Sequence, residues 1–262
     1  MATLREIRRR IVGVKSTAKI TQAMKMVAAA KLRRAQDSIN AARPYARALE
    51  DLLKNLLESA SLENVASPLL IGRALDRPEK VLLVVVTSDR GLAGAFNSAL
   101  LKFTELRIRE QYAEHLKDGR LTIVPVGRRA TDYFTKRGYT MPAKYPGIFT
   151  KLEFDTAREI THLVTDLYDR EEADRVDLIY NEFRSVVSQK PTAERLMPVL
   201  EATASGGAQQ ATADSDYIYE PDPISILNVL VPRHLETMVW RALLESNAAE
   251  QGARMTAMDS AT

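Results

Sequence analysis

ITQAMKMVAAAKLRRAQ, residues 20–36, consists largely of strong helix formers, and neither Gly nor Pro interrupts it. The stretch is basic, because it holds Lys25, Lys31, Arg33 and Arg34 against no acidic residue. It also carries a row of small and flexible apolar residues. It therefore predicts a helix that packs against a partner, and the partner is nucleic acid, a membrane or another protein.

The apolar row of this helix extends far beyond the quoted stretch. Apolar or small residues recur every seven positions in two series, spaced three and four apart, which is typical of a coiled coil. Lys25 is the one break in the first series, and Pro44 is expected to kink or locally break the helix. The sequence thus predicts a coiled-coil helix over residues 1–60. The two series are Leu4, Ile11, Ala18, Leu32, Ile39, Ala46, Leu53 and Ile7, Val14, Thr21, Ala28, Ala35, Ala42, Leu49, Leu56.

A second long helix is predicted in residues 217–262, after the turn DYIYEPDP, with Pro232 marking its start or a kink. Its inward-facing residues run from Leu227 to Ser260, and their side chains become smaller towards the C-terminus. Small side chains let the backbones of two helices approach closely. The simplest arrangement is an antiparallel coiled coil projecting from the segment between the helices. If residue 56 lies level with about residue 221, residue 24 lies level with about residue 253 and residue 262 with about residue 15.

The middle segment, residues 75–200, predicts a small Rossmann-like α/β domain with a mostly parallel sheet. VLLVVVTS (81–88) is a β-branched run typical of a strand buried on both faces, and strands at 121–127 and 175–183 follow. Helices are expected at about 98–116, 128–137 and 153–172, and an extended strand within 185–199. Residues 201–216, rich in Gly, Ala and Ser, predict a flexible linker.

Composition excludes several classes of site. The chain has no Cys, so disulfides, thiolate ligands and Cys nucleophiles are excluded, and its three His show no metal-ligand spacing. No apolar run is long enough to span a bilayer. No catalytic, cofactor-binding or metal-binding residue is therefore predicted.

Charge is unevenly placed along the chain. The net charge is +3, whereas residues 1–35 hold ten basic side chains and one acid, Glu6. This asymmetry predicts an acidic partner for the first helix. Nucleic acid remains an alternative, but aromatic interleaving and a known reading motif are missing, so an acidic protein surface is favoured.

The loop SDRGLAGAFN, which follows the first strand and opens a helix, is the main candidate for chemistry. A glycine-bearing turn there can bind phosphate, so a nucleotide-binding α/β enzyme with a coiled-coil arm is the alternative function. The signal is weak, because no dinucleotide or P-loop glycine pattern is present. A hydrolase is disfavoured, since no His lies nearby, and Asp89 is expected to cap a turn. The residues concerned are Ser88, Asp89, Arg90, Gly91, Gly94 and Asn97.

Several motifs in order resemble the gamma subunits of F-type ATP synthases. They are LREIRRRIVGVKSTAKITQAMKMVAAAKLRRAQ (4–36), RPYA (43–46), TSDRGLAGAFN (87–97), SQKPT (188–192), YIYEPDP (217–223) and ESNAAEQGARMTAMDSAT (245–262). The resemblance covers nearly the whole chain. It implies a central rotor shaft that couples ion-driven rotation of the membrane c-ring to ATP synthesis or hydrolysis elsewhere, without catalysis or a cofactor of its own.

The resemblance also implies partners and contact residues. The partners are a ring of three alpha and three beta subunits, the epsilon subunit and the c-ring, with one copy of this chain per complex and no nucleic acid. The location is peripheral, at the cytoplasmic face of a bacterial plasma membrane. Met24 and Lys25 match a stretch facing acidic segments of the beta subunits, and Gln251 and Arg254 match the opposing stretch. Tyr217, Tyr219 and Glu220 match the foot near epsilon and the c-ring.

Two features depart from the family pattern. The pattern continues for a few helical turns beyond a motif such as AMDSAT, so the chain is expected to be truncated or partial, with Leu4, Ile7 and Ile11 exposed. Pro232 is not expected in the second helix.

Overall fold

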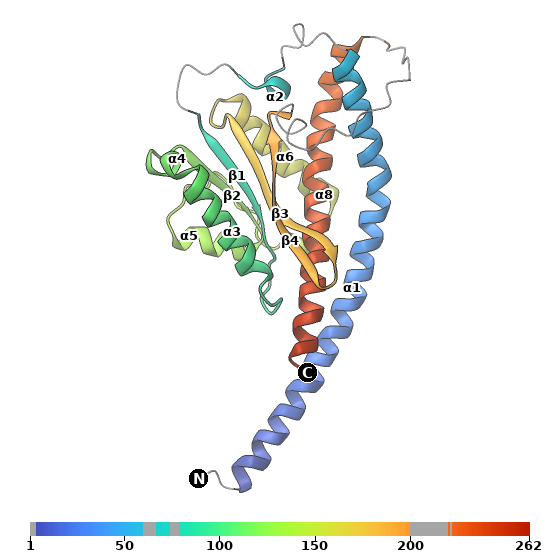
Figure 1. The fold of residues 1–262 in the computed structure, drawn as a ribbon, viewed down its shortest axis with the longest axis vertical. Helices are drawn as coiled ribbons and strands as arrows, with labels where there is room; N and C mark the ends of the chain where they lie inside the picture. The colour runs from blue at the N-terminus through green and yellow to red at the C-terminus, as the bar shows by residue number, and fades with distance from the viewer. Residues whose placement is uncertain (1–3, 60–66, 74–78, 200–219, 221) are drawn as a thin grey trace.

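The computed structural model describes residues 4–59, 67–73, 79–199, 220 and 222–262. Helix α1 (Leu4–Ser59) and helix α8 (Pro223–Ser260) lie side by side and antiparallel, and an α/β domain lies along α8 (Figure 1). The predicted linker 201–216 and the foot residues Tyr217 and Tyr219 lie outside the described residues.

Both long helices pass through a proline. Helix α1 is continuous over 56 residues with Pro44 inside it, so the expected local break is not found. Helix α8 begins at Pro223, where the missing N–H costs nothing, and the Asp222 carboxylate caps it by accepting from the Ser225 N–H at 2.9 Å. Pro232 lies within α8, so a helix start at Pro232 was a wrong prediction.

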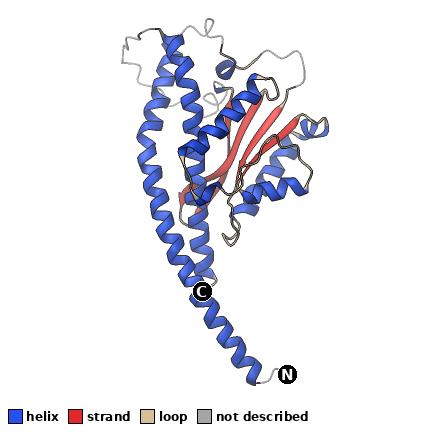
Figure 2. Cartoon of the chain, turned by 180° about the vertical axis from the view of Figure 1, so that it is seen from behind, coloured by secondary structure: helices blue, strands red, loops and turns tan. Residues whose placement is uncertain are grey.

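The sheet confirms the predicted α/β class. Its order is β2-β1-β3-β4, in which β1 is parallel to β2 and β3, and β4 is antiparallel to β3. Figure 2 shows the strands as red arrows between helices. All six residues of β1 are buried, as its β-branched run predicts. The strands are β1 (Val81–Val86), β2 (Leu121–Val126), β3 (Arg175–Ser185) and β4 (Ser188–Met197).

Helices cover both faces of the sheet. One apolar cluster joins the sheet to α3 and α5, and another joins its other face to α6 and α8. The single helix predicted at 98–116 is divided at Tyr112, whose ring is buried and whose hydroxyl donates to the Asp177 carboxylate at 2.5 Å. The remaining helices are α2 (Pro68–Ile71), α3 (Phe96–Gln111), α4 (Ala113–Lys117), α5 (Arg128–Lys136), η2 (Ile148–Thr150) and α6 (Phe154–Asp169).

The two long helices and the domain share one core. Leu53 and Leu56 of α1, Leu235 and Val239 of α8, and the α6-facing side of the sheet belong to the same buried cluster. The coiled coil therefore lies along the domain for much of α8, rather than simply projecting from it. The first turns of α1 extend past the end of α8 (Figure 1), and Leu4 is 80% exposed there.

The register of the two helices differs from the prediction. The hydroxyls of Thr21 and Thr262 lie 2.7 Å apart, and Lys25 Nζ lies 2.5 Å from Asp259 Oδ1. Residue 24 is therefore level with about residue 259, not with about residue 253, a difference of roughly 9 Å along the helix. The cause is the end of the coil, where α1 continues to Ser59 and α8 begins only at Pro223.

Candidate functional site

The loop between β1 and α3, residues 87–95, is fixed at its base by Ser88 and Asn97. The Ser88 N–H donates to Asn97 Oδ1 at 3.0 Å, and Asn97 Nδ2 donates to Ser88 Oγ at 2.9 Å. The Ser88 hydroxyl also donates to the Arg90 carbonyl oxygen at 2.7 Å. Two of the predicted loop residues thus fold the loop itself.

Asp89 links its own loop by hydrogen bonds to two other segments of the domain, the start of α5 and the segment at 147–149. Its carboxylate accepts backbone N–H groups from Arg128 at 2.9 Å, Gly147 at 2.6 Å and Phe149 at 3.0 Å. A carboxylate with three such donors is held in place by the backbone and has little capacity left for substrate. The arrangement agrees with the structural role that the sequence favoured over a hydrolase site.

The tip of the loop packs against α8. Gly91 and Gly94 lie at this contact, and a Cβ on Gly94 would lie 3.6 Å from the Ala257 Cβ. Behind them, Ala93 and Phe96 form a small buried cluster with two alanines of α8, Ala249 and Ala253. The small residues in the C-terminal part of α8 therefore pack against this loop as well as against α1.

A buried ion pair secures the same contact. Arg254 Nη1 donates to the Gly91 carbonyl oxygen at 2.7 Å, and the other terminal nitrogen of Arg254 pairs with Glu250 one helical turn earlier. Gln251 Nε2 donates to the second Glu250 oxygen at 3.1 Å. The Glu250 side chain is only 7% exposed, so its charge depends on these donors.

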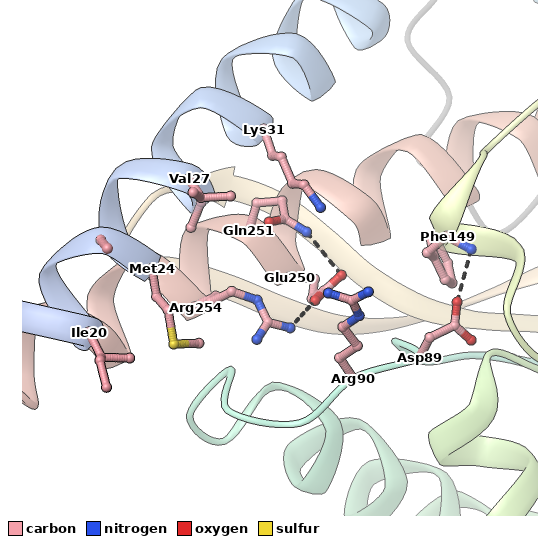
Figure 3. Close-up of a pocket in the computed structure, with 12 residues that line it drawn as sticks. Ile20, Met24, Val27, Lys31, Asp89, Arg90, Phe149, Glu250, Gln251 and Arg254 are labelled. Atoms are coloured by element: carbon pink, nitrogen blue, oxygen red, sulfur yellow. Dashed lines mark hydrogen bonds and ion pairs between the residues drawn. The ribbon is translucent and has the colours of Figure 1, made fainter. Parts of the chain in front are cut away.

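The predicted partner-contact residues fall into two groups in space. Met24 and Arg254 face the same space between α1 and the loop, although the register places them at different heights (Figure 3). Lys25 reaches instead to Asp259, and its side chain remains 40% exposed. Its place at the edge of the coil explains the break in the apolar series. Glu220 is exposed near the start of α8, at the other end of that helix, so the structure does not bring it to this junction.

Sequence reasoning missed a second polar cluster, between α8 and the sheet. Arg241 pairs with the Glu194 carboxylate at 2.6 Å, and the Tyr180 hydroxyl donates to the same carboxylate at 2.8 Å. Burial, with Arg241 nearby, lowers the pKa of His234 from 6.5 to about 4. Burial, reinforced by Glu194, raises the pKa of Tyr180. The sequence signal is weak, because Arg241 lies beside the apolar stripe of α8 and its partner Glu194 lies far away in the sequence, on β4.

No catalytic centre is assembled at the junction. Within the described part of the chain, no group of three or more His, Asp or Glu side chains is placed to hold a metal ion. Over the same residues, no helix combines the length and the apolar character needed to cross a membrane. What the junction does provide is a packed and hydrogen-bonded joint between α8 and the domain.

Comparison with known proteins agrees with this architecture. The family model described as ATP synthase matches residues 3–262. The ATP synthase gamma chains of Chloroherpeton thalassium and Chlorobaculum tepidum are each 50% identical to this chain, over 100% of it and 87% of their own length. A chain in the solved central stalk and c-ring of Tetrahymena thermophila mitochondrial ATP synthase is 25% identical and has a TM-score of 0.66. That match covers 92% of this chain and 99% of the other.

A more distant structure supports the fold alone. A chain of the Euglena gracilis mitochondrial ATP synthase rotor is 19% identical and has a TM-score of 0.59, over 98% of this chain and 89% of that one. The family match along nearly the whole sequence, the two relatives at 50% identity and the shared architecture lead to one conclusion: the chain belongs to the family of ATP synthase gamma chains.

Proposed function

We propose that this chain is the central shaft of a rotary ATP synthase, turning inside a ring of three alpha and three beta subunits with one copy per complex. The observation that carries the proposal is the continuous core from the paired helices into the α/β domain. A shaft must transmit torque between its ends, and densely packed interiors transmit strain because they have low compressibility.

The charge distribution supports the position of the ring. Residues 1–35 hold ten basic side chains against one acid, although the net charge of the whole chain is only +3, and the first turns of α1 extend beyond α8. A charge spread over many exposed Lys and Arg side chains attracts an acidic surface without fixing one geometry, which suits sliding contacts. We assign Met24, Lys25, Gln251 and Arg254 to contacts with the alpha and beta subunits.

The residues at the opposite end are assigned to the foot. Glu220 is exposed near the start of α8, and Tyr217 and Tyr219 precede it in sequence. We assign all three to contacts with the epsilon subunit and the c-ring. The complex then holds the chain at the cytoplasmic face of a bacterial plasma membrane. In this proposal the chain has four parts: a coiled-coil helix at 1–60, an α/β domain at 75–200, a linker at 201–216 and a second coiled-coil helix at 217–262.

The mechanism needs no bond chemistry within this chain. Rotation of the c-ring turns the foot, and the shared core carries the turn to α1 and α8. The helix pair is asymmetric, because α1 is longer than α8 and the domain lies on one side only (Figure 1). Each orientation therefore presents a different surface to each catalytic site in the ring, and the ring responds by population shift.

Co-expression with alpha and beta subunits tests the proposal. The expected result is a complex of three alpha, three beta and one copy of this chain, which is stable to size-exclusion chromatography and hydrolyses ATP. Purification of the folded chain apart from a separate alpha and beta assembly contradicts the proposal. Circular dichroism of the separated chain distinguishes that result from misfolding.

A further inference from the structure

A cavity lies where α1, the loop after β1 and α8 meet. Its volume is about 370 Å³, within the range of pockets that hold small molecules. The wall on α1 is apolar and includes Ile20, Met24 and Val27. Ile20 and Val27 are more than half exposed, although each is a large apolar side chain. In the chain on its own, the space is therefore open to solvent and suited to an apolar body.

Three cationic side chains and two carboxylates line this cavity, so positive charge is in excess. Two carboxylates line it, but Asp89 is occupied by three backbone N–H groups, and Glu250 by Arg254 and Gln251. Lys31 and Arg90 also line it, and among the described residues neither side chain has a hydrogen bond or ion pair. Figure 3 shows these two cations projecting from opposite sides, α1 and the loop, towards the same space.

We propose that this cavity binds amphipathic organic anions, of the class of medium-chain carboxylates. The alkyl chain lies along Ile20, Met24 and Val27, and the carboxylate lies between Lys31 and Arg90. Such a ligand contacts α1, the loop and α8 at once. Its binding therefore stabilises the joint between the helix pair and the domain, and raises the melting temperature of the chain.

Calorimetric titration of the full chain with octanoate, nonanoate and decanoate, below their micelle concentrations, tests both parts of the ligand. The expected result is saturable binding at one site, with affinity rising about fourfold per added methylene. Decan-1-ol, which has the same apolar body without the charge, is expected to bind about tenfold more weakly. An affinity independent of alkyl length, or absence of saturable binding, overturns the proposal.

Charge variants locate the site. Lys31→Gln with Arg90→Gln is expected to weaken decanoate binding about tenfold, whereas Lys15→Gln with Lys19→Gln removes the same charge elsewhere on α1 and leaves affinity unchanged. Equal losses in the two double variants mean that decanoate binds any cationic surface, which overturns the proposal. Val27→Asp gives an independent check, because it places a carboxylate on the exposed apolar wall and is expected to abolish binding. Unchanged affinity in that variant also overturns the proposal.

Discussion

Arg254 of α8 donates a hydrogen bond to the carbonyl oxygen of Gly91 at 2.7 Å, and so connects the second long helix to the loop that leaves the central strand of the sheet. The two residues are separated by more than half of the chain. The same guanidinium neutralises Glu250. One side chain thus fixes the position of the domain on the shaft and compensates a buried charge.

Replacement of Arg254 by Gln is expected to destabilise the chain by about 3 kcal/mol, because it leaves Glu250 buried and uncompensated. Urea unfolding of the full chain measures the change. The double variant Arg254→Gln, Glu250→Gln is expected to recover part of the loss, because the buried charge is then gone. Arg170→Gln is the matched control: Arg170 pairs with Asp166 on the surface, 3.8 Å away, and its loss is expected to cost less than about 1 kcal/mol. Equal losses at the two arginines would contradict the role of burial.

Gly127 connects β2 to α5 at a place where a side chain cannot fit. Its φ is +91°, and a Cβ there would lie 2.3 Å from the Thr87 carbonyl oxygen. Gly127→Ala is expected to lower stability by about 3 kcal/mol, from backbone strain together with this clash. Gly138 has φ +71° with nothing within 4 Å of its Cβ position, so Gly138→Ala isolates the strain, about 1 kcal/mol. Thermal unfolding of both variants checks the difference, and similar melting temperatures would contradict the close approach.

Lys25 and Asp259 form a pair whose side chains are 40% and 62% exposed. Lys25→Gln is expected to change the free energy of unfolding by less than about 1 kcal/mol, because solvent screens exposed pairs. Urea unfolding at low and high salt measures it, with Lys15→Gln as the control for loss of charge alone. A loss above 2 kcal/mol would mean that the coil depends on this pair.

His234 is expected to make stability depend on pH. Its pKa is lowered to about 4 in the folded chain from 6.5, so between these values the unfolded chain binds more protons. Stability from this residue is therefore full above pH 6.5 and is lost as pH falls towards 4, by about 2 kcal/mol between pH 7 and pH 5. Urea unfolding of the unsubstituted chain and of His234→Gln at both pH values measures the difference. The same loss in both proteins would show that other groups cause the dependence.

The elements of the fold were predictable from local patterns. The run VLLVVV predicted a buried strand, and the seven-residue repeat of apolar positions predicted a helix of about the observed length. Tyr112, which ends α3, was missed because its reason is a distant one, a buried hydrogen bond to Asp177. The helix break expected at Pro44 and the helix start expected at Pro232 were wrong, because both residues lie within helices whose stability comes from packing.

The site was less predictable than the fold. The loop residues were found by their place after a strand, but the partners of Asp89 come from segments about 40 to 60 residues away. The helix register was wrong because it was set by placing residue 56 level with residue 221, whereas α1 continues to Ser59 and α8 begins only at Pro223. Arg241 and Glu194 were missed because only the folded chain brings α8 to β4.

Rotation of this chain can be observed in single complexes. The chain has no Cys, so Lys117→Cys on the exposed surface of α4 provides the one thiol of this chain, to which a bead is attached. The complex with alpha and beta subunits is immobilised through the ring and supplied with ATP. The bead is expected to rotate persistently in one direction and to stop when ATP is removed. An active, correctly assembled complex whose bead shows only undirected fluctuation would contradict the claim that this chain is the turning shaft.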